Sequence, residues 1–222
     1  MHDVLINKKV LAKNNEIAES NRTMLREKGI FAINLMSSPG SGKTSLVEKT
    51  VELLKNRVKI AVIEGDIQTD LDTQRILKHG VPAIQITTGR LCHLDACMIH
   101  HTLPWVFEQG RTDLMIIENV GNMVCPAEYD LGEDVKAAIM SVTEGDDKPL
   151  KYPSLFCASQ YLLINKIDLL AYTNFDMEKA RRNALMINPK LKIIATSCID
   201  GTGIKEWTES ILANKMYRKD AR

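Results

Sequence analysis

Residues 37–44 combine glycines, a lysine and a threonine in an order suited to holding phosphate. The run SSPGSGKT follows an apolar segment and precedes a helical pattern. Glycines let the backbone curl around a phosphate, and the N–H groups at a helix N-terminus face negative charge. The Lys43 side chain can reach the β- and γ-phosphates, and the Thr44 hydroxyl can be a ligand of Mg²⁺. Although Ser37 replaces the usual first glycine, we expect a nucleotide phosphate site. Its members are Ser38, Pro39, Gly40, Ser41, Gly42, Lys43, Thr44 and Ser45.

A second motif, Asn165-Lys166-Ile167-Asp168, has the residue types that read guanine. It closes an apolar strand pattern, and open α/β sheets present ligand contacts at such strand ends. The Asp168 carboxylate is suited to accept from the ring N–H and the exocyclic amine of guanine, which adenine does not offer together. We expect Lys166 over the base or against the phosphate loop, and Ser197-Cys198 behind the base. The nucleotide is therefore predicted to be GTP or GDP.

Two acid-bearing strand ends lie between these motifs. One is Glu64-Gly65-Asp66, and the other is Glu118-Asn119-Val120-Gly121, which has the spacing of the DxxG switch motif with Glu as its acid. A carboxylate in the 118–121 motif can hold Mg²⁺ directly or through water, and the Gly121 N–H can meet the γ-phosphate. Thr44, Asp66 and Glu118 are the predicted magnesium ligands.

Catalysis by such residues would consist of positioning and charge stabilisation. The predicted catalytic residues are Lys43, Asp66, Asp72 and Glu118. Which of Asp66, Asp70 and Asp72 completes the magnesium shell or orients water is left open, since Asp70 and Asp72 also fit exposed helix caps. No intrinsic arginine finger is evident, so we expect slow turnover.

Cysteine and histidine gather near the second acidic motif. Cys92-His93 is expected to begin a helix over 91–109, on which His93, Cys97 and His101 would share one face. Cys125 follows the 118–121 motif. Thiolate with imidazole suits Zn²⁺ or Ni²⁺ far better than Mg²⁺. The predicted metal ligands are Cys92, His93 and Cys125; Cys157 and Cys198 are read as packing residues.

Three ligands in each chain would leave a metal site incomplete, which favours a symmetric homodimer that shares it. Because Cys125 follows the 118–121 switch, the nucleotide state could open or close the site. Whether Cys97, His100 or His101 joins the site is left open.

The elements that position these residues alternate along the chain. Nearly continuous Ile, Leu and Val runs predict strands buried on both faces of a parallel sheet, at 30–36, 59–64, 83–87, 114–120, 137–142, 161–165 and 193–196. Helical patterns fall at 43–56, 68–79, 91–109, 175–187 and 203–216. This alternation predicts an α/β, doubly wound, mostly parallel sheet of about seven strands with helices on both faces. Residues 1–29 are expected to hold an amphipathic helix, and 30–222 the P-loop GTPase domain.

Bulk properties narrow the function. The chain has 222 residues, 45% hydrophobic and 26% charged, with a formal net charge of +1. The balanced charge provides no general attraction to nucleic acid or to an anionic membrane. No export signal or membrane-spanning run is seen, so a cytoplasmic protein is expected.

With these motifs in place, the sequence resembles the hydrogenase nickel-incorporation GTPases, the HypB family of the dimeric SIMIBI class of P-loop proteins. The strings that carry the resemblance are SSPGSGKT (37–44), EGDIQTD (64–70), ITTGRLCHLDA (86–96), IIENVGNMVCPAEYDLG (116–132), TEGDDKPLKYP (143–153) and NKID (165–168). The resemblance implies GTP hydrolysis coupled to nickel delivery to the [NiFe]-hydrogenase large subunit precursor, with a maturation partner. It also implies a GTP-promoted dimer, in which Lys148 or Lys151 touches the partner's nucleotide.

Three other functions also fit the sequence. The client could be another metalloenzyme, as for the urease-type or cobalamin-type GTPases, although the Cys-Pro-His triplet of the urease type does not occur. A P-loop kinase acting on a small molecule would prefer adenine and would leave 165–168 without a purpose. A binding switch with incidental turnover is a further alternative.

Overall fold

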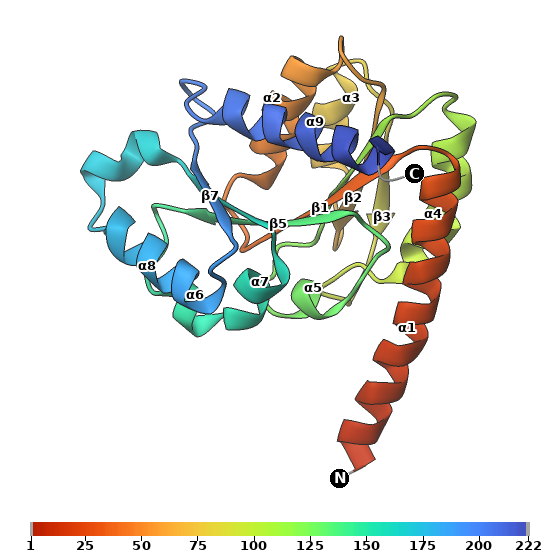
Figure 1. The fold of residues 1–222 in the computed structure, drawn as a ribbon, viewed down its shortest axis with the longest axis horizontal. Helices are drawn as coiled ribbons and strands as arrows, with labels where there is room; N and C mark the ends of the chain where they lie inside the picture. Colours follow the sequence, from red (N-terminus) through yellow and green to blue (C-terminus); the bar gives the residue numbers. More distant parts are fainter. Residues whose placement is uncertain (1, 221–222) are drawn as a thin grey trace.

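A computed structural model describes residues 2–220 and shows one parallel sheet between two layers of helices (Figure 1). Seven strands run in the order β3-β2-β4-β1-β5-β6-β7, and every neighbouring pair is parallel. The strands are β1 (Phe31–Ser37), β2 (Ile60–Asp66), β3 (Ala83–Thr87), β4 (Leu114–Glu118), β5 (Val135–Ser141), β6 (Tyr161–Asn165) and β7 (Lys192–Ala195). The predicted fold class and all seven predicted strands are confirmed.

Helices connect the strands and cover both faces of the sheet. They are α1 (His2–Glu27), α2 (Lys43–Leu54), α3 (Leu71–Leu77), α4 (Ala96–Glu108), α5 (Cys125–Glu128), α6 (Lys148–Lys151), α7 (Pro153–Ala158), the 3₁₀ turn η1 (Ile167–Tyr172), α8 (Met177–Ile187) and α9 (Ile204–Asp220). Helices α2, α3 and α9 lie on one face, and α7 and α8 on the other (Figure 1). None of the helices within 2–220 combines the length and apolarity needed to cross a bilayer.

The middle and the carboxyl-terminal part of helix α1 pack on the rest of the molecule. Ala18 and Leu25 are fully buried, and Leu25 packs with residues of α4 and of strands β1, β2 and β4. The amino-terminal part of α1 extends away from the rest of the molecule (Figure 1). The helix predicted within residues 1–29 is therefore present, and its carboxyl-terminal half packs against the sheet domain.

The predicted helix over 91–109 is wrong at its start. Helix α4 begins at Ala96, because the Asp95 side chain caps it by accepting a hydrogen bond from the Met98 N–H. Residues 91–95 are irregular, so His93 does not share a helix face with Cys97. The short helices α5, α6 and α7 were not predicted.

Replacing Trp207 by alanine is expected to lower the free energy of unfolding by about 4 kcal/mol. Trp207 of α9 is fully buried, its indole N–H donates to Thr50 Oγ1 of α2 at 3.1 Å, and its ring lies 5.4 Å from that of Tyr161. Urea unfolding followed by circular dichroism measures the loss. Tyr172→Ala is the control, since Tyr172 is 86% exposed. Equal midpoints for both variants would contradict this packing role.

Candidate nucleotide and metal sites

The phosphate loop lies between β1 and α2, as predicted. Gly42 has a left-handed backbone and precedes the first turn of α2. The Lys43 ammonium donates to Ser37 Oγ at 3.0 Å, and the Ser41 hydroxyl donates to the same oxygen at 2.6 Å. Ser37, where the common pattern has glycine, therefore gives Lys43 and Ser41 a shared hydrogen-bond acceptor in the loop.

A cleft of about 510 Å³ opens beside this loop at the carboxyl ends of β2 and β4. Gly121 of the 118–121 motif approaches the loop so closely that an added Cβ would lie 3.1 Å from Pro39 Cα. The cleft is lined by Pro39, Gly40, Gly42, Lys43, Thr44, Ser45, Glu64, Gly65, Asp66, Ile67, Asp72, Arg75, Glu118, Asn119, Val120, Gly121 and Lys166. The loop, both acidic strand ends and Lys166 thus meet in one cavity.

Two buried carboxylates face each other in this cleft. Glu64 of β2 and Glu118 of β4 are opposite each other in the sheet, and Glu118 Oε1 accepts from the Thr44 hydroxyl at 2.8 Å. Glu64 Oε1 and Glu118 Oε2 are buried without a hydrogen-bond partner among the described residues. Burial raises the pKa of both carboxyls, and for Glu64 the charge of Glu118 raises the pKa further. Clustered carboxylate and hydroxyl oxygens fit Mg²⁺, which would relieve this repulsion.

Of the three aspartates considered for the magnesium shell, Asp66 and Asp72 line the cleft and Asp70 is not among its lining residues. Asp66 lines the cleft and accepts from the Gln68 N–H at 3.0 Å. Asp72 also lines the cleft, paired with Arg75 at 3.1 Å, whereas Asp70 accepts from the Gln74 side chain.

Sequence reasoning placed Glu64 at an acidic strand end without giving it a role, and it missed Arg75 as a cleft residue. Glu64 lies two residues before Asp66 on the same face of β2, and the alternation of strand side chains is a signal for its position. Arg75 reaches back from α3 to the Ser45 hydroxyl at 3.2 Å and to Glu48. No local motif indicates that contact.

The predicted base reader lies against the phosphate loop. The Asn165 amide donates to the Ser41 carbonyl at 2.9 Å, and Lys166 Nζ donates to the Gly40 carbonyl at 2.6 Å. Asp168 Oδ1 is shielded from solvent without a hydrogen-bond partner in the described structure. An unsatisfied carboxylate oxygen suits a ligand that donates N–H groups.

The segment after β7 supports Asn165. The Thr196 hydroxyl and the Cys198 thiol both point to Asn165 Oδ1, at 3.2 and 3.7 Å. Ser197 Oγ accepts from the Ile199 N–H at 3.2 Å. Burial raises the pKa of the Cys198 thiol to about 11, so the thiol is neutral and acts as a packing and hydrogen-bonding group.

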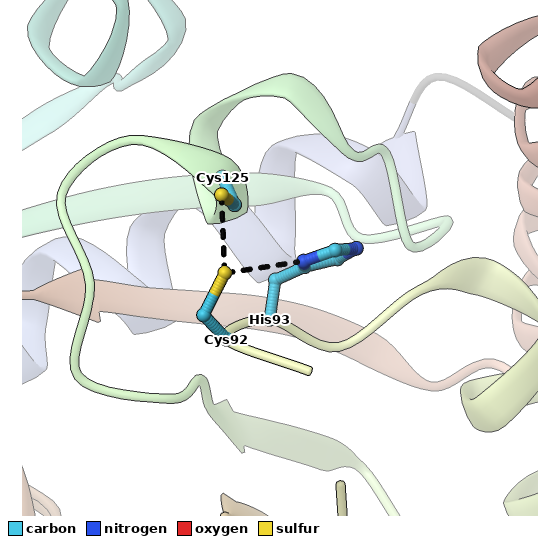
Figure 2. Close-up of side chains that lie close together, drawn as sticks. All are labelled: Cys92, His93 and Cys125. Carbon is cyan, nitrogen blue, oxygen red and sulfur yellow. Dashed lines mark hydrogen bonds between the residues drawn. The ribbon is translucent and has the colours of Figure 1, made fainter. Parts of the chain in front are cut away.

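Cys92, His93 and Cys125 come together in one protomer (Figure 2). Cys92 Sγ lies 3.1 Å from Cys125 Sγ and 3.9 Å from His93 Nδ1, and the three ligand atoms lie within 4.8 Å of one another. Burial lowers the pKa of His93, which favours the neutral imidazole that binds metal. Two sulfurs and one nitrogen form a soft donor set that fits Zn²⁺ or Ni²⁺.

The other candidate ligands lie apart from this cluster. Cys97 Sγ of α4 lies 3.6 Å from His101 Nδ1 on the exposed side of the helix. His100 Nδ1 lies 2.8 Å from the Asn21 side-chain oxygen, in a structural contact with α1.

The two lysines expected near a partner's nucleotide are paired within the protomer. Lys151 lies 2.6 Å from Asp147. Lys148 lies 3.6 Å from Glu144 and over the Tyr152 ring.

The fold and the cleft define a P-loop nucleotide-binding protein that carries a cysteine–histidine cluster close in sequence to the 118–121 motif. Residues 31–195 match the family model described as CobW/HypB/UreG, nucleotide-binding domain, and the chain belongs to this family, within its HypB branch.

Three relatives support the assignment. Hydrogenase maturation factor HypB of Azotobacter vinelandii is 49% identical, over 98% of this chain and 71% of the relative. The crystal structure of hydrogenase maturation factor HypB from Archaeoglobus fulgidus is 42% identical, with a TM-score of 0.86 over 92% of this chain and 99% of that one. The structure of HypB from Helicobacter pylori in complex with nickel is 37% identical, with a TM-score of 0.89 over 92% and 96%.

Proposed function

We propose that this chain is a GTP-hydrolysing metallochaperone that delivers nickel during hydrogenase maturation. The observation that carries the proposal is the position of the Cys92–His93–Cys125 cluster. Cys125 follows Gly121 by four residues, and Gly121 lies against the phosphate loop. A change in the 118–121 segment on nucleotide binding would therefore move one metal ligand relative to the other two.

Guanine specificity is supported by Asp168 and by its neighbours. The carboxylate oxygen that lacks a partner would accept from the ring N–H and the amine of guanine. Asn165 and Lys166 donate hydrogen bonds to the phosphate loop, which supports a base site and a phosphate site next to each other. Adenine does not supply the two donors, which argues against the small-molecule kinase alternative.

Hydrolysis would follow from charge stabilisation in the cleft. Lys43 and the loop N–H groups would face the phosphates, and Thr44 with Glu118 would hold Mg²⁺, which would neutralise charge on the phosphates when bound. Glu64, Asp66 and Asp72 are the carboxylates placed to complete the magnesium shell or to orient water. Arg75 lines the cleft but is paired with Glu48 and Asp72, so it is not assigned to the transferred phosphate and we expect slow turnover.

The metal is the cargo of this cycle. Three ligands in one protomer leave at least one position for a fourth donor, which a second copy, the client or a maturation partner could supply. We infer that GTP promotes a homodimer in which residues 30–222 act as the GTPase domain. Lys148 or Lys151 would have to leave its acidic partner to touch the nucleotide of the second copy.

A nucleotide-dependent change in nickel affinity tests the proposal. Sedimentation of the full chain should show a dimer with Mg²⁺ and a non-hydrolysable GTP analogue and a monomer with GDP. Chelator competition should show nickel affinities that differ about 10-fold between the two states, a usual size for coupling between sites. In Lys43→Ala, the nucleotide effect should disappear while nickel binding without nucleotide persists. Equal nickel affinities in both states of the unmodified chain would refute the coupling.

A further inference from the structure

Helix α1 buries two asparagines on the side that faces the sheet domain. Asn14 is 6% exposed and Asn21 is fully buried, although both lie in the interior of a helix. Asparagine is a poor helix former, and a buried amide destabilises the fold unless it is hydrogen-bonded. The hydrogen bonds of Asn14 and Asn21 therefore show which segments of the chain helix α1 holds in place.

Both asparagines bridge the same two segments of the chain. The Asn21 amide donates to the Ala96 carbonyl at 2.8 Å and to the Leu131 carbonyl at 3.1 Å. The Asn14 amide donates to the Asp130 carbonyl at 2.8 Å, and its oxygen accepts from the Ala96 N–H at 2.9 Å. One segment is the start of α4, and the other is the loop over 129–132.

Each of these two segments follows metal ligands closely in the sequence. Ala96 lies three residues after His93, and the 129–132 loop directly follows α5, which begins at Cys125. The Tyr129 ring stacks on the His93 ring with centroids 4.0 Å apart, so the loop also touches a ligand directly. Helix α1 thus connects the Cys92–His93 side of the cluster to the Cys125 side.

The loop is held closely against α1. Arg22 donates to both carboxylate oxygens of Asp130, at 2.8 and 2.7 Å, and the Gly132 N–H donates to the same carboxylate at 2.9 Å. Gly132 has a φ of +92°, and an added Cβ would lie 2.6 Å from the Ala18 carbonyl oxygen. This contact leaves no room for the loop to approach further.

We propose that α1 is a clamp for the cargo-metal site, in which Asn14, Asn21 and Arg22 are positioning residues. They fix the spacing of Cys92 and His93 relative to Cys125, so the ligands are arranged before the metal arrives. The proposal rests on the proposed function only in taking Cys92, His93 and Cys125 as the site that binds the cargo metal. Residues that orient metal ligands without touching the metal commonly change metal affinity by 10- to 100-fold.

Titration of the full chain with Co²⁺ and with Ni²⁺ tests the clamp. Asn21→Ala removes both bridging bonds of that residue and should weaken metal binding about 10-fold. It should also change the Co²⁺ absorption bands, which report the geometry of the ligands. Arg22→Gln removes an ion pair near the surface without opening a buried cavity. It should weaken binding about 3-fold, less than Asn21→Ala, because Arg22 contacts only the 129–132 loop side of the site, through Asp130. Thr23→Ala, at an exposed position of the same helix, is the matched control and should match the unmodified chain.

The readouts separate positioning from general damage. Affinity for a fluorescent GTP analogue should be unchanged in all three variants, because α1 does not line the nucleotide cleft. If Asn21→Ala does not fold, Arg22→Gln decides the question. The clamp would be overturned if the folded variants had the same metal affinity and the same cobalt bands as the unmodified chain. Equal losses of metal affinity and nucleotide affinity would also overturn it. The proposed function fails separately, if Cys125→Ser binds metal as tightly as the unmodified chain.

Discussion

Replacing Asp168 by asparagine is expected to weaken GTP binding about 1,000-fold and to create a preference for xanthosine triphosphate. Each hydrogen bond to a charged group contributes about 1.5–3 kcal/mol. The loss of two such bonds is therefore enough to account for the roughly 4 kcal/mol of binding free energy that a 1,000-fold change in affinity requires. The asparagine amide would point an N–H toward the guanine amine, whereas xanthine has a carbonyl oxygen there. Competition binding with GTP, XTP and ATP measures the change.

The control for this variant is Asp200→Asn, which removes an exposed carboxylate from the loop after Ser197-Cys198. It should leave the affinity for all three nucleotides unchanged. The substitution at Asp168 conserves shape, so the fold should persist. An unchanged GTP affinity in Asp168→Asn would show that the base is read elsewhere, and a preference for ATP in the unmodified chain would revive the kinase reading.

The strands were predictable because residues buried on both faces of the sheet must be apolar, and this is visible in the sequence. Strands inside a parallel sheet are covered on both faces, so they read as continuous apolar runs rather than as alternation. Strands β4 and β6 are buried at every position. Strand β7 lies at the sheet edge, and its first residue is exposed, yet three of its four residues still follow the pattern.

Helix boundaries were less predictable because local capping competes with periodicity. Residues 91–95 fit the helical pattern, but the Asp95 side chain stabilises a start at Ala96. Helices α5 and α6 have four residues each, too few for a period of 3.6 to be visible. The error mattered for the site, since it misplaced His93 on a helix.

The composition of the candidate sites was largely predictable, whereas their supports were not. Cys92, His93 and Cys125 meet as their chemistry suggests, although 33 residues separate the two cysteines. The contact from Asn21 to Leu131 spans 110 residues, and no feature near either residue indicates it. Motifs record chemistry that must occur in a local run of sequence; long-range hydrogen bonds depend on the packing of the whole chain.

Replacing Cys125 by serine is expected to weaken nickel binding by more than about 100-fold while GTP binding stays within about 2-fold. Changes outside the ligand shell already alter metal affinity by 10- to 100-fold, so the loss of a ligand should exceed that range. A serine hydroxyl remains protonated and is a harder donor than thiolate, so it does not replace the sulfur. Equilibrium dialysis with metal analysis measures the affinity, and the sulfur-to-nickel charge-transfer absorption should decrease with it.

The matched control is Cys157→Ser, because Cys157 is an exposed cysteine of α7 outside the cluster. Its nickel affinity should equal that of the unmodified chain. The GTP analogue should still dimerise Cys125→Ser, since Glu118 and Gly121 remain in place on the phosphate side of the 118–121 segment. The variant would then bind nucleotide and change its assembly without moving any metal. If Cys125→Ser keeps full nickel affinity, the cargo binds elsewhere, and the proximity of Cys125 to the 118–121 segment has no role in metal delivery.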